Sequence, residues 1–289
     1  MTHLKETKGF TGMSEFWVTA PHGPIRSREK TRFFPVHEGK KVIVTGAAGG
    51  IGSALVALLV SEGATVAALD LREDALREGI AKYEGKVVAV GCDLAQQRSV
   101  ETAFRQSIEQ LGTIDGVVNN AALVRRGDAI DASWDDWQSS MAVNVYGAFE
   151  LSRLAAKSMA ERGKGGAIVN VASEAGKKGH TQSITYGASK AALISMTRIL
   201  AASLAPYDIN VNCVCPGGVG TDMLRAAAAN YARVSGGDVD DIFPRLVSSQ
   251  LKRHITPDEV ARTISFLLSD DALIIRGQAV NTDGGDTPY

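Results

Sequence analysis

Short, nearly continuous apolar segments alternate with longer amphipathic segments along most of the chain. Apolar runs of this length are typical of strands in a parallel sheet that is buried on both faces. The amphipathic segments are typical of helices that pack on those faces. The predicted strands cover residues 41–45, 65–69, 86–90, 115–118, 166–172, 209–214 and 277–282. The fold class that follows is α/β, with a doubly wound, seven-stranded parallel sheet and helices on both faces.

The predicted helices lie between these strands. The clearest cover residues 53–62, 96–111, 133–162 and the segment from Ser183 onward. Residues 224–251 begin as an alanine-rich helix and continue, after two consecutive glycines, as a second short amphipathic piece. Thr256 and Pro257 predict the start of the last helix, because threonine caps helices and proline fits their first turn.

Residues 1–38 show neither a helical nor a strand period, so we predict an N-terminal extension ahead of a single domain at residues 39–289. Two interpretations stay open for this extension. It is either a flexible tail, or an arm that buries its aromatic side chains against a neighbouring subunit or near a pocket. The arm would avoid the unfavourable exposure of several aromatic side chains.

The composition fits a soluble globular protein with one large core, since 45% of the 289 residues are hydrophobic and 22% are charged. A net charge of −1 argues against nucleic acid and anionic membranes as partners and favours a small molecule. No apolar run approaches the roughly 20 residues that span a bilayer, and the N-terminus lacks the apolar core of a signal peptide. We therefore expect a cytoplasmic protein.

The three cysteines, Cys92, Cys213 and Cys215, include no C-x-x-C pair. An odd count without such a pair argues against a disulfide framework and against a zinc site, so we expect no metal. The simplest interpretation of Cys213 and Cys215 is that they are small apolar residues of a buried strand.

A glycine-rich turn, residues 46–52, separates the first predicted strand from the first predicted helix. Strand, glycine turn and helix in this order are the context that a dinucleotide site requires. Gly46, Gly50 and Gly52 allow the backbone to turn tightly and to approach a pyrophosphate, whose charge the helix N-terminus stabilises. By itself such a glycine pattern is a weak indication.

Asp70 ends the second predicted strand and bears on the choice of dinucleotide. A carboxylate in this place accepts hydrogen bonds from the ribose hydroxyls of NAD and repels the 2′-phosphate of NADP. Arg72 argues the other way, because its guanidinium could pair with that phosphate. We expect NAD to be preferred over NADP.

Tyr186 and Lys190 lie four residues apart in a predicted helix, so the phenol and the ammonium share one face. A phenol titrates near a pH of about 10 and is a poor base at neutrality unless a neighbouring cation stabilises the phenolate. Ser173 follows the fifth predicted strand, at the sheet edge where open α/β folds bind their substrates. A chance pairing on a solvated helix face is the alternative for Tyr186 and Lys190.

Together these motifs resemble the short-chain dehydrogenase/reductase family over residues 39–285. The glycine turn has the T-G-x-x-x-G-x-G spacing of the family's shorter-chain branch. Asn144, Ser173, Tyr186 and Lys190 match the order and spacing of its catalytic residues. The resemblance implies a Rossmann-like fold and hydride transfer between a secondary alcohol and NAD.

The resemblance also implies a role for each of these four residues. Tyr186 would exchange the proton of the alcohol, and Ser173 would hold the reacting oxygen. Lys190 would lower the pKa of the phenol and bind the nicotinamide ribose. Asn144 would loosen its helix and hold a water that relays the proton to solvent.

A larger set of residues is implied to contact the cofactor. Asp93 would touch the adenine, and it could also cap the helix that follows. Thr221 and the backbone of Val219 would hold the nicotinamide carboxamide. Gly49 and Leu71 stand where NADP-dependent relatives often carry basic residues. The implied set is Gly46, Gly49, Gly50, Ile51, Gly52, Asp70, Leu71, Asp93, Leu94, Asn120, Ala121, Ala122, Tyr186, Lys190, Pro216, Gly217, Val219, Thr221 and Met223.

The substrate pocket is implied to lie beside Ser173 and Tyr186, with Glu174, His180 and Gly218 as further candidates. Residues 221–252 match a substrate-binding lid. Their length and the preceding sequence most resemble family members that act on polyols, sugars and acetoin-type diols. Such members are often homotetramers, so we expect a homotetramer or a homodimer.

Asn119 is implied to support the packing of the central strand. Arg125, Arg126 and Asp128, in the loop after the fourth predicted strand, are interpreted as a solvated charge cluster at the pocket rim.

Three alternatives to an NAD-dependent alcohol dehydrogenase remain. One is an inactive NAD(H)-binding sensor or interaction protein on the same fold, because a fold alone does not fix a function. Another is a 3-oxoacyl-type carbonyl reductase that uses NADPH. A sugar-nucleotide epimerase or dehydratase is disfavoured by the chain length and by the spacing of the glycine turn.

Overall fold

The sheet has seven parallel strands in the order β3-β2-β1-β4-β5-β6-β7. The structure is a computed structural model that describes residues 36–83, 85–248 and 250–287. The strands are β1 (Lys41–Thr45), β2 (Thr65–Asp70), β3 (Val87–Gly91), β4 (Gly116–Asn119), β5 (Gly166–Val171), β6 (Ile209–Pro216) and β7 (Ala279–Thr282). The predicted strands are confirmed, with shifts of one or two residues at some ends. The predicted extension, residues 1–38, lies outside the described residues except for its last three.

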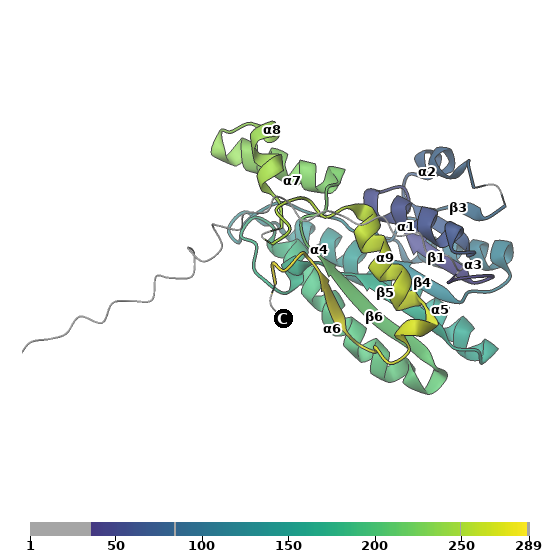
Figure 1. Ribbon diagram of the computed structural model, residues 1–289. Helices are drawn as coiled ribbons and strands as arrows, with labels where there is room; N and C mark the ends of the chain where they lie inside the picture. The colour runs from purple at the N-terminus through teal and green to yellow at the C-terminus, as the bar shows by residue number, and fades with distance from the viewer. Residues whose placement is uncertain (1–35, 84, 249, 288–289) are drawn as a thin grey trace, which may run out of the picture.

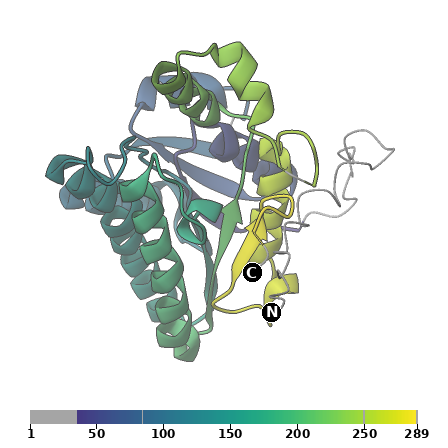
Figure 2. The ribbon, with the colours of Figure 1, turned by 90° about the vertical axis from the view of Figure 1, so that its left-hand side faces the viewer.

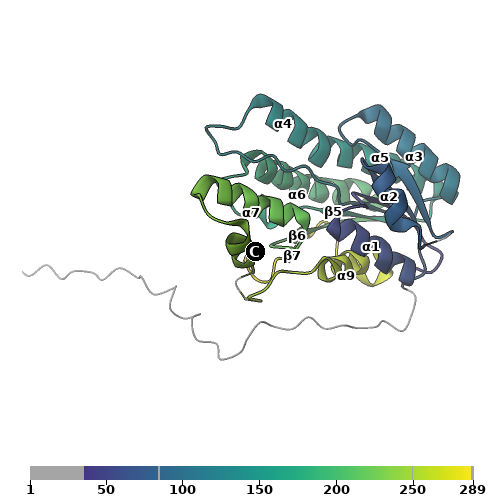
Figure 3. The same cartoon turned by 90° about the horizontal axis from the view of Figure 1, so that it is seen from above.

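Helices cover both faces of the sheet, as Figure 3 shows from above. One layer contains α1 and α9, and the other contains α3, α5 and α6. The helices are α1 (Gly50–Ser61), α2 (Glu73–Ile80), α3 (Gln97–Leu111), α4 (Trp134–Met141), α5 (Ala148–Arg162), α6 (Ile184–Leu204), α7 (Asp222–Ser235), α8 (Val239–Ile242) and α9 (Pro257–Leu268). Thr256 forms a capping box with Glu259 at the start of α9, as its sequence predicted.

Successive residues of the strands supply two separate cores, because their side chains alternate between the faces. Val42 and Val44 of β1 belong to the core under α1 and α9. Ile43 belongs to the core under α3 and α5. All three are buried, and each contributes roughly 1.5 to 3 kcal/mol by leaving water. This two-sided burial explains why the strands are mostly apolar.

The strand order reverses at β1, which pairs with β2 on one side and β4 on the other. Ligands of open α/β sheets bind at such a switch point, outside the carboxyl ends of the strands. Figure 1 shows α7 and α8 standing apart from the two helical layers. In Figure 2, β6 points toward these two helices. The residues that follow β1, β4, β5 and β6 therefore meet beneath them.

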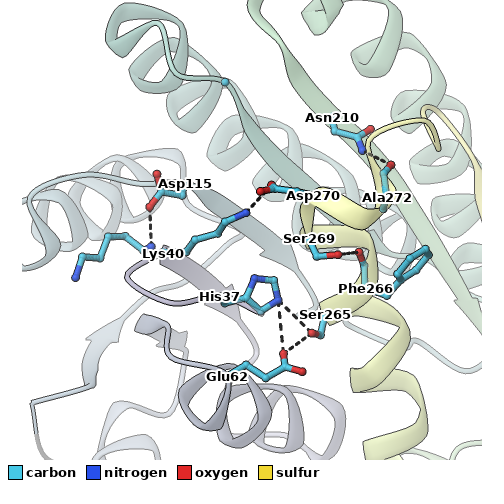
Figure 4. Close-up of polar contacts among 12 residues, drawn as sticks. His37, Lys40, Glu62, Asp115, Asn210, Ser265, Phe266, Ser269, Asp270 and Ala272 are labelled. Carbon is cyan, nitrogen blue, oxygen red and sulfur yellow. Dashed lines mark hydrogen bonds and ion pairs between the residues drawn. The ribbon is translucent and has the colours of Figure 1, made fainter. Parts of the chain in front are cut away.

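The first described residues are tied to α1 and α9 by a buried polar cluster (Figure 4). His37 Nε2 lies 3.1 Å from Ser265 Oγ, and the Ser265 hydroxyl donates to Glu62. The Lys40 ammonium forms an ion pair of 2.8 Å with Asp270 just beyond α9. These contacts fix the entry of the chain into β1.

The segment Ile184–Tyr207, which contains α6, is long and apolar enough to span a bilayer, so the expectation that no run approaches this length is wrong for it. The same helix packs along β6 and against the short turn at Glu174–Gly176. Its polar residues Thr185, Ser189 and Lys190 are buried.

Candidate active site

A single cavity of about 820 Å³ runs along the carboxyl ends of the strands, from the glycine turn to α7. Its wall brings together residues from segments that are far apart in the sequence. The predicted site residues that line it are Gly46, Gly49, Gly50, Ile51, Asp70, Leu71, Asp93, Leu94, Asn120, Ala121, Ala122, Ser173, Glu174, His180, Tyr186, Lys190, Pro216, Gly217, Gly218, Val219, Thr221 and Met223. Gly52 and Asn144 do not line it and act from behind the wall.

The glycine turn requires glycine at two positions, one because of its backbone conformation and one because of a close contact. Gly46 has a φ of +64°, a conformation that costs other residues energy. A Cβ on Gly52 would lie 2.1 Å from the backbone oxygen of Gly46, so Gly52 is required for packing and not for contact with a ligand. The Asn120 amide donates to the Thr45 carbonyl at 2.9 Å and holds β4 against the turn.

The start of α1 has donors available for an anion. Its N-cap residue, Gly49, provides no side-chain hydrogen bond to the first turn. Gly49, Gly50 and Ile51 line the cavity, and the uncapped backbone N–H groups of a helix start suit a diphosphate. A Cβ on Gly50 would lie 2.6 Å from Thr221 Cγ2, so this glycine also lets the loop after β6 approach the turn. The residues present therefore fit the dinucleotide that the sequence implies.

Asp70 lies at the adenosine end of the cavity and is held by the backbone. Its carboxylate accepts hydrogen bonds of 3.0 Å from the N–H groups of Ala48 and Arg72. The Arg72 guanidinium is mostly exposed and lies 4.0 Å from the same carboxylate. Asp93 accepts from the Ala95 N–H at 2.9 Å. Its suggested role as a helix cap is wrong, because α3 begins after Gln96 and has no side-chain cap.

Ser173 stands two residues after the end of β5 and lies beside Tyr186 in the cavity wall. Its hydroxyl accepts a hydrogen bond of 3.1 Å from the Ala175 N–H. The same hydroxyl lies close enough to the phenol of Tyr186 to lower its pKa by hydrogen bonding. Two hydroxyl groups that share a hydrogen bond in a cavity wall can both contact one oxygen of a ligand.

Lys190 is buried one turn after Tyr186. Its ammonium donates a hydrogen bond of 2.7 Å to the Val171 carbonyl and lies 5.6 Å from the centroid of the Tyr186 ring. Burial lowers the pKa of Lys190 to about 8, because desolvation disfavours the charged form. The predicted face-sharing pair is confirmed.

The predicted effect of Lys190 on the phenol is not found. Burial raises the pKa of Tyr186, while the hydrogen bond with Ser173 and the charge of Arg126 lower it. The Lys190 ammonium is hydrogen-bonded to the backbone of β5. The cation that lowers the pKa of the phenol is Arg126, in the loop after β4.

Asn144 lies in a π-helical segment, Ala142–Gly147, which interrupts the helix predicted at residues 133–162. Its amide oxygen accepts from the Leu123 N–H at 2.7 Å, and its amide nitrogen donates to the Leu123 carbonyl and to Ser189 Oγ, each at 2.9 Å. Asn144 therefore joins the loop after β4 to α6 behind the Tyr186 face. The π segment agrees with the expectation that the helix is loosened here.

The comparisons with known proteins agree with this geometry. A family model described as enoyl-(acyl carrier protein) reductase matches residues 46–287. The chain belongs to the short-chain dehydrogenase/reductase family. As a member of it, the chain is an oxidoreductase that interconverts an alcohol and a ketone.

Three similar proteins illustrate the family. The 2,5-dichloro-2,5-cyclohexadiene-1,4-diol dehydrogenase of Sphingobium indicum is 37% identical, over 86% of this chain and 97% of the relative. The NAD-dependent glycerol dehydrogenase of Listeria innocua is 34% identical, over 86% of this chain and 94% of the relative. A crystal structure of a short-chain type dehydrogenase/reductase from Mycobacterium marinum superposes with a TM-score of 0.78 at 31% identity, covering 88% of this chain and 97% of that one.

Two of the substrate candidates, Glu174 and His180, contact each other. The Glu174 carboxylate forms an ion pair of 2.9 Å with Lys178 and lies 3.5 Å from His180 Nε2. These two partners lower the pKa of Glu174 against the opposing effect of burial. In this short-chain dehydrogenase/reductase, the carboxylate of Glu174 in the cavity wall is therefore already paired with Lys178 and close to His180.

Arg125 and Arg126 were assigned together to a solvated cluster, and the structure separates them. Arg125 is exposed, donates to Ser139 Oγ at 3.2 Å and lies 3.9 Å from Asp136. Arg126 is partly buried and lines the cavity with Tyr231 of α7. The solvated interpretation is therefore wrong for Arg126. Its place after β4 was the available signal, since residues there face the ligand crevice.

Other expectations about polar and sulfur groups are confirmed. Asn119 donates to Ser152 Oγ at 2.9 Å and to Asn170 Oδ1 at 2.8 Å, which links β4 to its neighbours. All three cysteines are free and buried.

Proposed function

We propose that this chain is an NAD-dependent dehydrogenase that interconverts a secondary alcohol, in a polyol, sugar or vicinal diol, and the corresponding ketone. The observation that carries the proposal is that Ser173, Tyr186 and Lys190 line the same cavity as Asp70 and the glycine turn. The diol and glycerol dehydrogenases among the relatives support this substrate class.

The dinucleotide would be held at three places along the cavity. The glycine turn and the start of α1 suit its diphosphate, and Asp70 and Asp93 suit the adenosine. Val219 and Thr221 suit the nicotinamide end, where the Thr221 hydroxyl lies 3.3 Å from the Val219 carbonyl. The nicotinamide, when bound, accepts or supplies the hydride.

The protein's own groups would handle the proton. Ser173 would hold the reacting oxygen by a hydrogen bond, and Tyr186 would take the hydroxyl proton of the alcohol or return it to the ketone. The raised pKa of Tyr186 keeps the phenol protonated at neutral pH, which is the form that donates to a ketone. Oxidation requires that this proton be lost first.

Lys190 and Asn144 would support Tyr186 from behind. The Lys190 ammonium is anchored to the Val171 carbonyl beside the Tyr186 ring and would bind the nicotinamide ribose from there. Asn144 fixes the loop after β4 and the Ser189 hydroxyl, and it would hold the water through which the proton leaves.

Asp70 supports a preference for NAD. A 2′-phosphate in this place would meet a carboxylate that two backbone N–H groups already hold in position. Arg72 is the opposing feature, but its guanidinium is 69% exposed and its attraction is weakened by solvent. The same carboxylate disfavours an NADPH-dependent 3-oxoacyl reductase.

The remaining assignments rest on composition and on surface features. Residues 221–252 would act as a lid, since α7 and the residues after α8 line the cavity from one side. Tyr146, Phe149 and Ile199 are large exposed side chains of one helical layer, which supports a homotetramer or homodimer. Three free cysteines support a cytoplasmic location.

An absorbance screen for NADH tests the proposal. Purified protein would be incubated with NAD or NADP and a panel of secondary alcohols, polyols, sugars and vicinal diols. Turnover with NAD and at least one polyol, sugar or diol is expected. Cofactor binding without turnover of any member would favour an NAD(H)-binding sensor instead.

A further inference from the structure

Arg126 is a cation of the cavity wall that pairs with no carboxylate of the described residues. Among the residues that the structure describes, none forms a hydrogen bond or an ion pair with its guanidinium. Burial lowers the pKa of Arg126, and the neighbours that oppose this effect are the phenols of Tyr231 and Tyr186. A partly buried guanidinium without a carboxylate is unusual, because desolvation of a charge is costly unless it is paired.

The adjacent Arg125 shows the ordinary alternative. Its guanidinium is 50% exposed and reaches Asp136 and Ser139 of α4. Two consecutive arginines thus have opposite environments, one on the surface with a carboxylate and one in the cavity without one.

The position of Arg126 is fixed relative to Tyr186 by the backbone. The Gly127 N–H donates to the Gln182 carbonyl at 3.2 Å, and the Ile184 N–H donates to the Gly127 carbonyl at 3.5 Å. This parallel bridge joins the loop after β4 to the first residues of α6, two positions before Tyr186. Arg126 is therefore held at the same end of the cavity as the phenol.

Arg126 follows β4 and is joined through Gly127 to the start of α6, whereas the parts that suit the phosphates of a dinucleotide follow β1 and β2. The diphosphate would lie at the start of α1, and a 2′-phosphate would approach Asp70. The lining of the same cavity includes Arg245, which follows α8 and also lacks a hydrogen bond or ion pair within the described part of the chain. The carboxylate of Glu174 at this end is already neutralised by Lys178 and His180.

We propose that Arg126 determines substrate specificity by binding an anionic group, a carboxylate or a phosphate, of the polyol, sugar or diol that reacts at Tyr186. The inference rests on the proposed function, which it deepens by naming the charge of the substrate. A guanidinium binds either group through paired N–H donors, and such charge-assisted hydrogen bonds are stronger than neutral ones. The substrate would supply the negative charge that the protein does not.

A second role is compatible with the same geometry, because the charge of Arg126 also lowers the pKa of Tyr186. An effect through Tyr186 alone would change the turnover of charged and neutral substrates equally. The ratio of the affinities for charged and for neutral ligands therefore isolates binding of the anionic group.

The test compares charged ligands with their neutral counterparts. Isothermal titration calorimetry of the NADH-loaded protein would use D-gluconate against D-glucitol, and glycerate and glycerol 3-phosphate against glycerol. The two glycerol derivatives distinguish a carboxylate from a phosphate. The variants are R126Q, which removes the charge, R126K, which keeps it without the paired donors, and R125Q as the matched control.

At least one charged ligand is expected to bind about 10- to 100-fold more tightly than its neutral counterpart, the range for a hydrogen bond to a charged group. R126Q should remove this preference, R126K should retain part of it, and R125Q should bind like the wild type. The proposal is overturned if no charged ligand binds better than its counterpart, or if R126Q and R125Q behave alike. Turnover of neutral diols without any preference for anions would overturn this inference only, whereas anion binding without turnover of any alcohol would overturn the proposed function only.

Discussion

The ammonium of Lys190 lies over the ring of Tyr186, 5.6 Å from its centroid, while its hydrogen bond of 2.7 Å goes to the Val171 carbonyl. Lys190 is thus anchored to β5 while lying over the Tyr186 ring. Its side chain is 1% exposed, and burial lowers its pKa to about 8. A buried cation there lowers the free energy of unfolding, whereas an uncharged methionine would not.

This cost predicts a pH-dependent difference in stability between the wild type and K190M. Unfolded Lys190 titrates at its ordinary pKa of 10.5, and folded Lys190 titrates at about 8. Between these values the unfolded state binds more protons, so the stability of the wild type relative to K190M should rise with pH. The rise should total about 3 kcal/mol. Urea denaturation of both proteins from pH 7 to 10.5 measures it, and a constant difference would contradict the buried charge.

Replacing Tyr186 by phenylalanine should remove proton transfer and leave the cavity intact. We expect kcat of Y186F to fall by about 10²- to 10⁴-fold, the usual contribution of a positioned acid or base. NADH binding, followed by fluorescence titration, should persist. The double variant S173A/Y186F should be little worse than Y186F, since Ser173 and Tyr186 act on one oxygen. Turnover of Y186F at the wild-type rate would exclude the proposed proton transfer.

Replacing Asp70 by serine should shift the cofactor preference toward NADP. Removing the carboxylate removes a repulsion worth several kcal/mol against a 2′-phosphate, so the NAD to NADP ratio of kcat/KM should fall by about 10- to 100-fold. R72Q is the matched control, because Arg72 is exposed and should leave the wild-type preference for NAD in place. Equal ratios in D70S and the wild type would show that Asp70 does not select the cofactor.

Two alanine substitutions in the glycine turn should differ in their effect on stability. The Cβ of G52A would lie 2.1 Å from the backbone oxygen of Gly46, so the turn must shift, at a cost of about 1 to 3 kcal/mol. For G49A the nearest atom is 3.5 Å away, an ordinary contact, and the change should stay within about 1 kcal/mol. Thermal unfolding should show a clearly lower Tm for G52A than for G49A. A similar Tm for both would mean that the turn is less closely packed than this structure indicates.

The strands and the glycine turn could be predicted because their causes are local. Two-sided burial makes β1, β5 and β6 mostly apolar, and this pattern is visible without knowledge of the neighbouring strands. Ser173 could be placed for the same reason, since it lies two residues after the end of one of these strands. By contrast α2 was not predicted, because only Leu76 of its eight residues is buried and its apolar face is too small to show a period.

The electrostatics of the site could not be predicted, because they depend on contacts between distant segments. The sequence spacing predicted that Lys190 and Tyr186 share one helix face. It gave no indication that the ammonium would be hydrogen-bonded to the Val171 carbonyl. In the same way Arg125 and Arg126 are indistinguishable as neighbours in the sequence. Only the position of Asp136 on α4, and the bridge from Gly127 to α6, separate a surface arginine from a cavity arginine.

The bridge from Gly127 to the residues before α6 uses main-chain groups alone. The side chain at position 126 can therefore be exchanged in the course of divergence without disturbing the support of Tyr186. A single codon change there would alter which substrates a descendant enzyme accepts, together with the charge beside the phenol, while the backbone that positions the phenol is inherited unaltered.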